Sequence, residues 1–185
     1  AELLSGKITA VLKDLNFLDV KFAIDFQESA PGPEGFDTIC FLISMNPGQP
    51  LMPLQKVASG GELSRVMLAI KTVLADKDAV GTMIFDEIDV GISGRTAQKV
   101  SEKMAVIARS RQVICVTHLP QIAAMADHHF LIEKTSSADS TISNIRSLNR
   151  EESIHELARM LGGVKITDTV LQNAKEMKEM ADAVR

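Results

Sequence analysis

The stretch between residues 82 and 117 constrains the fold more than any other part of the chain. Thr82–Phe85 and Gln112–Thr117 are short apolar runs, and Gly94–Ala108 between them carries apolar side chains at helical spacing. A strand, a helix and a strand joined by short connections form a βαβ unit, whose strands run parallel and end at the same edge of a sheet. The sequence therefore predicts an α/β fold built on a parallel strand pair.

The chain before this unit predicts an extra N-terminal hairpin between two helices. Residues 2–16 have the spacing of an amphipathic helix, and Val20–Gln27 and Asp37–Met45 are expected to pair as strands around a loop at Ser29–Gly35. From Ser59 the period becomes helical, and this is the clearest helix of the chain. Its apolar positions are Leu63, Val66, Met67, Ile70, Val73 and Leu74.

The chain after this unit continues the alternation of helices and strands. The expected elements are a helix at Pro120–Ala126, strands at His129–Glu133 and Thr141–Leu148 around a polar turn at Thr135–Ser140, a helix ending at Gly162-Gly163, and a last helix from about Thr167. The predicted architecture is a largely parallel sheet flanked by helices, with the hairpin added at the N-terminus.

The composition narrows the class of protein. With 20 Lys and Arg against 24 Asp and Glu, the 185 residues carry a formal net charge of −4, which argues against a protein that holds nucleic acid mainly by neutralising phosphates. Aromatic residues make up 4%, with no Trp or Tyr, so a platform that stacks single-stranded bases is not expected. No apolar run reaches about 18 residues and no signal-peptide pattern begins the chain, which favours the cytoplasm and no membrane partner.

Two cysteines, Cys40 and Cys115, lie in apolar strands. Neither belongs to a pattern typical of a disulfide framework or a zinc site. We expect both to be buried, reduced thiols.

Ser59-Gly60-Gly61-Glu62 opens the clearest helix. Ser followed three residues later by Glu is the pattern of a capping box, in which each side chain satisfies a backbone amide at the helix start. Capping does not explain two consecutive glycines, since each costs about 1 kcal/mol relative to Ala in a helix interior. Glycine leaves the amides uncovered at the positive end of the helix dipole, which favours an anion such as phosphate. A helix cap and an anion site both stay open at this point.

Polar residues follow the two strands of the βαβ unit. Asp86 and Glu87 follow the first strand and His118 follows the second. Open α/β sheets bind ligands at the carboxyl ends of their strands, so we expect these three side chains at one edge. One carboxylate suits Mg²⁺, usually held through water, and the other suits activation of a water beside a phosphate. The alternative is a solvated acidic turn and a polar strand end.

Together and in this order, the three sites resemble the C-terminal lobe of an ABC-type ATPase head. SGGE resembles the signature motif of such heads, MIFDE the Walker B strand, and His118 the switch histidine. The flanking segments are similar to the RecN family, the SMC-like ATPases of bacterial DNA double-strand-break repair, over most of the chain. These segments are FLISMNPGQPLMPLQKVASGGELSR, FDEIDVGISGRTA, THLPQIAAMADHHFLI and ELARMLGG.

The resemblance implies a role for each residue at the strand ends. Glu87 would be the general base for the attacking water, and His118 would contact the γ-phosphate of ATP. Asp86 would help to hold Mg²⁺, through water.

The resemblance also implies contacts with a second head. The signature residues, which would contact the γ-phosphate of ATP held by the opposite head, are Ser59, Gly60, Gly61 and Glu62. The residues that match the D-loop, which crosses to the partner head, are Asp89, Gly91 and Ser93. Gly91-Ile92-Ser93 stands where the family more commonly has an A-L-D run, which leaves open the residue that crosses.

Such heads carry their Walker A loop in an N-terminal half, before a long coiled coil, and this sequence has no G-x-x-x-x-G-K-[ST] loop. We therefore expect residues 1–18 to be the helix at the base of the coiled coil and residues 19–185 to be the C-terminal lobe. The implied partners are the N-terminal half, a second head in a homodimer and, in the whole protein, DNA at the bacterial nucleoid. This chain alone is expected to be inactive as an ATPase.

Two alternatives stay open. The chain can be a non-catalytic interaction module, in which SGGE is a helix cap and the carboxylates are solvated. It can also be the ATPase lobe of another ABC or SMC family member, such as a transporter.

Overall fold

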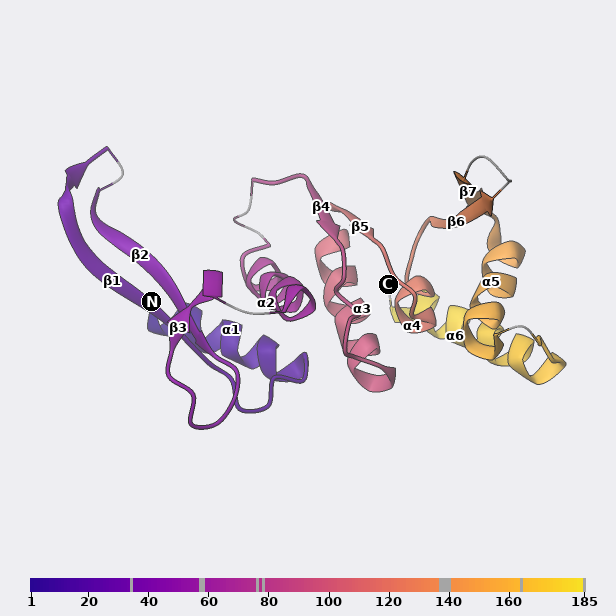
Figure 1. Ribbon diagram of the computed structural model, residues 1–185, viewed down its shortest axis with the longest axis horizontal. Coiled ribbons are helices and arrows are strands. Elements are labelled where there is room, and N and C mark those ends of the chain that lie inside the picture. Colours follow the sequence, from indigo (N-terminus) through magenta and orange to yellow (C-terminus); the bar gives the residue numbers. More distant parts are fainter. Residues whose placement is uncertain are drawn as a thin grey trace. The chain divides into compact units, whose positions relative to one another are not determined.

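The computed structural model describes residues 1–184 except 34, 57, 58, 76, 78, 137–140 and 164. It separates into two units, Ala1–Thr117 and His118–Arg185 (Figure 1). Both units combine helices with strands, as the predicted α/β class requires. No helix in the described part of the chain is long and apolar enough to cross a membrane.

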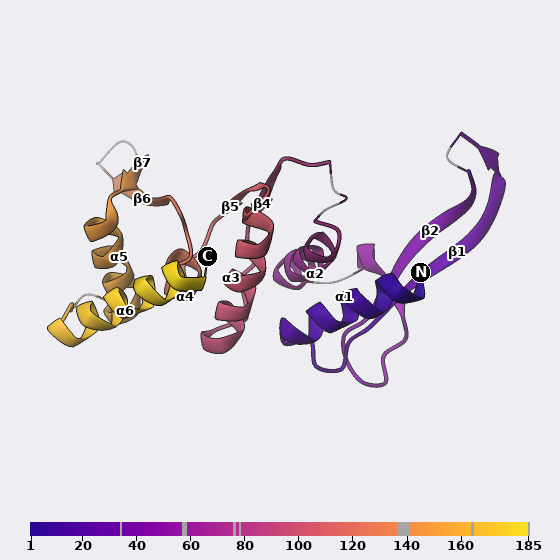
Figure 2. The ribbon, with the colours of Figure 1, turned by 180° about the vertical axis from the view of Figure 1, so that it is seen from behind.

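A long antiparallel hairpin and a helix begin the first unit. Helix α1 spans Glu2–Asp14, strand β1 spans Lys21–Gly32 and strand β2 spans Gly35–Ser44. α1 packs against β1, and the hairpin extends away from it (Figure 2). The short strand β3, Met52–Pro53, pairs with β2 and leads into a 3₁₀ turn at Leu54–Lys56.

The hairpin is longer than predicted, because β1 continues to Gly32, inside the expected loop at Ser29–Gly35. Its register shifts between Glu28 and Gly32, an irregularity that accommodates Pro31, which has no amide for the strand ladder. Near this end Phe26 and Ile39 pair across the strands and are exposed.

Helix α2 and the βαβ unit complete the first unit. α2 spans Gly60–Val73 and packs against α1 and α3. Strand β4 at Thr82–Phe85 and helix α3 at Gly94–Ala108 have the predicted bounds, and strand β5 covers Gln112–Cys115. β4 and β5 are parallel, which confirms the predicted βαβ unit.

The parallel sheet is covered on one face. Met83 and Phe85 of β4 are buried, whereas Ile84, Ile114 and Val116 are exposed. Among the described residues, the parallel sheet consists of β4 and β5. The other two sheets are antiparallel because their strands are neighbours in the chain and pair as hairpins.

The second unit is a hairpin followed by two packed helices. A short helix α4, Pro120–Ala123, precedes strands β6, His129–Ser136, and β7, Thr141–Leu148, which pair antiparallel. The predicted turn at 135–140 begins later, since β6 runs to Ser136, and residues 137–140 lie outside the described residues. The two closing helices are α5, Arg150–Gly162, and α6, Asp168–Val184, as predicted. The core of this unit consists of Ala123, Ala124, Leu157, Ala158, Ala174 and Ala181.

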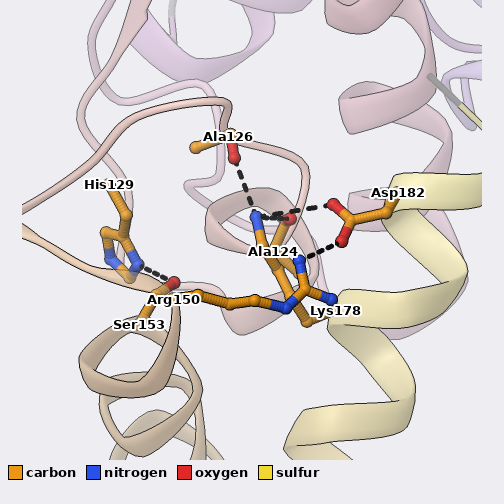
Figure 3. A network of polar contacts seen from close by, with 7 residues as sticks. All are labelled: Ala124, Ala126, His129, Arg150, Ser153, Lys178 and Asp182. Atoms are coloured by element: carbon orange, nitrogen blue, oxygen red, sulfur yellow. Dashed lines mark hydrogen bonds and ion pairs between the residues drawn. The ribbon is translucent and has the colours of Figure 1, made fainter.

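A buried lysine ties α6 to the segment after α4 (Figure 3). Lys178 is 6% exposed, and its ammonium donates to the carbonyls of Ala124 at 2.9 Å and Ala126 at 2.8 Å. Asp182 lies one turn further along α6 and pairs with Arg150 at 2.6 Å. The lysine bonds fix α6 against the start of the unit, and the ion pair fixes it against the start of α5.

Candidate functional site

The SGGE segment forms the start of α2. Ser59 is the N-cap residue, with φ −112° and ψ 129°, and its hydroxyl oxygen accepts a hydrogen bond from the Glu62 amide at 3.4 Å. Only this half of the predicted reciprocal capping box is present among the described residues. The cap interpretation is therefore confirmed in part, and the glycines need their own explanation.

Both glycines approach the turn that follows β4. A Cβ on Gly60 would lie 2.5 Å from the Glu87 carboxylate oxygen Oε2. A Cβ on Gly61 would lie 2.9 Å from the carbonyl oxygen of Glu87 and 3.1 Å from that of Val90. Close packing alone thus requires a glycine at position 61. An anion at the start of α2 would meet the Glu87 carboxylate, which stands beside Gly60.

Asp86 and Glu87 are exposed and directly follow the buried Phe85. The strand ends at Phe85, so the two carboxylates lie in a turn rather than on opposite faces of a strand. A carboxylate oxygen of Asp86 accepts a bond from the Glu87 amide at 2.9 Å. Glu87 has φ 57°, a left-handed conformation that non-glycine residues rarely adopt and that clusters at functional sites.

Residues of α2 hold this turn by its carbonyl groups. The Ser64 hydroxyl donates to the Asp86 carbonyl at 3.0 Å. Arg65 Nη1 donates to the carbonyl of Ile88 at 3.2 Å and to that of Val90 at 2.8 Å. Every second carbonyl between residues 86 and 90 therefore receives a bond from α2.

Ser64 and Arg65 were not among the predicted site residues, although the sequence carries a signal for them. Gly61, Ser64 and Arg65 have the i, i+3, i+4 spacing of one helix face. Arg65 falls among the buried residues of α2, where a charged side chain has to find partners.

The predicted D-loop residues are placed differently from one another. Asp89 is 3% exposed, and its carboxylate accepts a hydrogen bond from the Thr117 hydroxyl at 2.6 Å. Gly91, with φ 75°, and Ser93, which precedes α3, are exposed. Asp89 thus connects the turn to the end of β5, and the two exposed residues are better placed to meet a partner.

Burial and nearby carboxylates shift the pKa values of two groups near the turn. Burial lowers the pKa of Arg65, against the opposing charge of Glu62. Burial, followed by the charges of Asp89 and Asp86, raises the pKa of the Cys115 thiol to about 12. Cys40 and Cys115 are both free, and they are half-buried rather than buried as predicted.

His118 is the first residue of the second unit and is exposed. It directly follows Thr117, the partner of Asp89. That His118 shares an edge with Glu87 stays a prediction.

Comparison with known proteins shows that the chain is similar to part of the RecN DNA repair proteins. It is 42% identical over 187 residues to the DNA repair protein RecN of Halalkalibacterium halodurans, covering 98% of this chain and 33% of that protein. It is 45% identical over 179 residues to the RecN of Vibrio cholerae, covering 96% and 32%. The chain therefore spans about a third of the length of the curated relatives it matches. No family model matches the chain.

Solved structures give the fold. The Smc head domain with a coiled coil and joint from Pyrococcus yayanosii matches with a TM-score of 0.59 at 19% identity, over 84% of this chain and 28% of that one. A second match comes from work on the structural biochemistry of ATP-driven dimerization and DNA-stimulated activation of SMC ATPases. It has a TM-score of 0.50 at 17% identity and covers 89% of this chain and 94% of that one. The curated relatives confirm the predicted resemblance to RecN. The solved structures confirm the fold of an SMC-type head.

Proposed function

Starting from a chain similar to RecN proteins over nearly its whole length, we propose that it supplies the C-terminal lobe of an ATPase head in a protein of bacterial DNA double-strand-break repair. The head would bind and hydrolyse ATP between two paired copies, in the cytoplasm at the nucleoid. Residues 1–18 would be the base of the coiled coil and residues 19–185 the lobe. The observation that carries this proposal is the placement of exposed Asp86 and left-handed Glu87 at the end of β4, against the glycine start of α2.

Each residue then has a chemical task. Glu87 would take the proton of the attacking water, and His118 would donate to the γ-phosphate oxygens as they gain charge. Asp86 would hold Mg²⁺ through water, which suits an exposed carboxylate at the end of β4. Bound Mg²⁺ neutralises charge on the phosphates of ATP.

The contacts with the second head involve the remaining predicted residues. Ser59 and the two glycines would bind the γ-phosphate of ATP on the opposite head, aided by the helix dipole of α2. Glu62 would close this helix start, and Gly91 or Ser93 would cross the interface. For the glycines to receive a phosphate, the Glu87 carboxylate beside Gly60 has to turn away.

The exposed face of the parallel sheet supports the proposed N-terminal partner. Parallel sheets are normally covered on both faces, yet Ile84, Ile114 and Val116 are exposed. The half that carries the Walker A loop would cover this face and supply most of the affinity for ATP. DNA binding is proposed for the whole protein, not for this lobe alone.

The test is ATP hydrolysis by this chain alone and by the whole protein with its Walker A half. We expect the chain alone to bind ATP barely and not to turn it over. In the whole protein, Glu87→Gln should lower kcat by about 10²- to 10⁴-fold, the usual contribution of a general base, while ATP-dependent pairing of heads persists.

Glu151→Gln, an exposed carboxylate of the second unit, is the matched control and should leave kcat unchanged. Robust metal-dependent hydrolysis by the 185 residues alone would contradict the proposal. So would equal kcat values for the wild type and Glu87→Gln.

A non-catalytic interaction module is the second candidate, favoured by one observation: packing against the turn explains Gly61 without any phosphate. Gly60→Ala separates the two, since among the residues that the structure describes its Cβ would meet only the flexible end of the Glu87 side chain. In a phosphate site this variant should uncouple ATP binding from head pairing, whereas an interaction module should tolerate it.

A further inference from the structure

We propose that Arg65 is a positioning residue that sets the conformation of the Glu87 turn and connects it to the segment that follows α1. Its effect on hydrolysis rests on the function proposed above, while its effect on the turn does not.

The first argument is the set of bonds that Arg65 makes. One guanidinium nitrogen, Nη1, donates to the carbonyls of Ile88 and Val90, which lie on either side of Asp89. Within the described part of the chain, one backbone bond to Glu87 closes the turn on itself, from the Val90 amide to the Glu87 carbonyl at 3.1 Å. Glu87 is in a left-handed conformation, which persists only where neighbouring contacts impose it. Arg65 supplies two of those contacts.

The second argument is the environment of the guanidinium. Arg65 is 7% exposed, and its Nε is a buried nitrogen without a hydrogen-bond partner among the described residues. Burial lowers its pKa, and the charge of Glu62 opposes this. A buried charge with an unsatisfied donor does not favour folding on its own. Its place in the core of α2 is instead explained by the carbonyls it holds.

The third argument is the other side of the guanidinium. Its central carbon lies 5.4 Å from the centre of the Phe17 ring, a cation–π contact. Phe17 is buried, and its amide donates to the carbonyl of Leu12, in the last turns of α1. A displacement of the end of α1 would therefore move Phe17, the guanidinium and the two carbonyls together. The chain thus carries a route from α1 to the turn that holds Glu87.

The first test is hydrogen exchange of backbone amides in this chain. Arg65→Met keeps the aliphatic stem over Phe17 and removes the donors. The amides of Val90 and Ile92, which bond within the turn, should exchange about tenfold faster, as expected for the loss of a net hydrogen bond. The Gln112 amide bonds to Gly81, just before β4, and the Val116 amide bonds to Phe85, at the end of β4. Both amides serve as internal controls, and their exchange should not change.

Equal exchange at Val90 and Ile92 in the wild type and Arg65→Met would overturn the proposal. If Arg65→Met loses protection everywhere, Phe17→Leu gives the same readout, because it removes only the ring beneath the guanidinium. An increase confined to the turn supports the proposal, and unchanged exchange there overturns it.

The second test is hydrolysis by the whole protein. Arg65→Met should lower kcat about tenfold or more while KM for ATP stays within about twofold, the pattern of a lost transition-state interaction. Arg65→Lys, which keeps a donor, should recover part of kcat. Arg109→Met, at an exposed position, is the matched control and should leave kcat unchanged.

The two tests fail separately. A whole protein that does not hydrolyse ATP overturns the proposed function, while the exchange data still decide the role of Arg65 in the turn. Selective exchange in the turn together with an unchanged kcat overturns the effect of Arg65 on hydrolysis.

Discussion

Two helices of this chain begin with the same sequence pattern, a short polar residue followed three positions later by Glu, and their starts differ. At α5 the side chain of Asn149 accepts from the Glu152 amide at 2.9 Å, and Glu152 accepts from the Asn149 amide at 2.8 Å. At α2 the bond from the Glu62 amide to Ser59 is 3.4 Å long and is not reciprocated among the described residues. The start of α5 is capped by its own side chains in both directions. The start of α2 is capped in one direction and packs against a turn that is distant in the sequence.

This difference shows why one motif can have two purposes. A reciprocal cap stabilises a helix through groups within four residues of one another. The two glycines of α2 instead let Glu87 and Val90 approach the helix backbone. The glycines, rather than the Ser–Glu spacing, distinguish the two starts.

The largest effect is expected from a substitution that adds a side-chain atom where the start of α2 contacts the turn. In Gly61→Ala the added Cβ would meet two backbone carbonyl oxygens, so the free energy of unfolding should fall by about 1–3 kcal/mol, as for overpacked cores. Gly60→Ala is the matched control, because the end of the Glu87 side chain can move aside. Urea unfolding of both variants measures the difference. Equal losses would mean that close packing does not explain Gly61.

The next effect compares the two caps directly. Asn149→Ala should lower the free energy of unfolding by about 1 kcal/mol, the usual value of a good N-cap. Ser59→Ala should cost less, since a 3.4 Å bond is long for a hydrogen bond. Thermal unfolding of the two variants measures the difference between their stability losses. If Ser59→Ala costs as much as Asn149→Ala, the α2 start is a stabilising cap like that of α5.

The smallest expected effect is a pH dependence specific to α5. The bond from the Asn149 amide, and then Arg146, lower the pKa of the Glu152 carboxyl from its ordinary value of 4.5. The stability that this carboxylate contributes is therefore complete above about pH 4.5 and is lost as the pH falls through the lowered value. Glu152→Gln should flatten the decline of the urea midpoint between pH 5 and pH 3. A decline equal to that of the wild type would show that the cap does not titrate.

Local patterns predicted the elements well. β4 and α3 have the predicted bounds, because their apolar periods and the flanking Gly and Asp residues are readable within a few positions. Pro31 misled the prediction of β1, since a proline is usually a loop signal and is tolerated here only at a register shift.

The contacts of the candidate site were predicted less well. Asp86, Glu87 and the SGGE start were singled out because their residue types are unusual in their positions. The bonds of Ser64 and Arg65 join residues more than 20 positions apart. The spacing of apolar residues in the sequence does not predict such pairs. Asp89 likewise binds Thr117 instead of solvent, a pairing that depends on the packing of β4 beside β5.

The raised pKa of Cys115 has a practical consequence. With a pKa of about 12, roughly one molecule in a hundred thousand carries the thiolate at neutral pH. Alkylating reagents and peroxides should therefore react only very slowly with this sulfur. Spectroscopic labels can therefore be attached to cysteines introduced near the Glu87 turn without first replacing Cys115. Burial, followed by the charges of Asp89 and Asp86, thus protects this neighbour of the turn from oxidative damage.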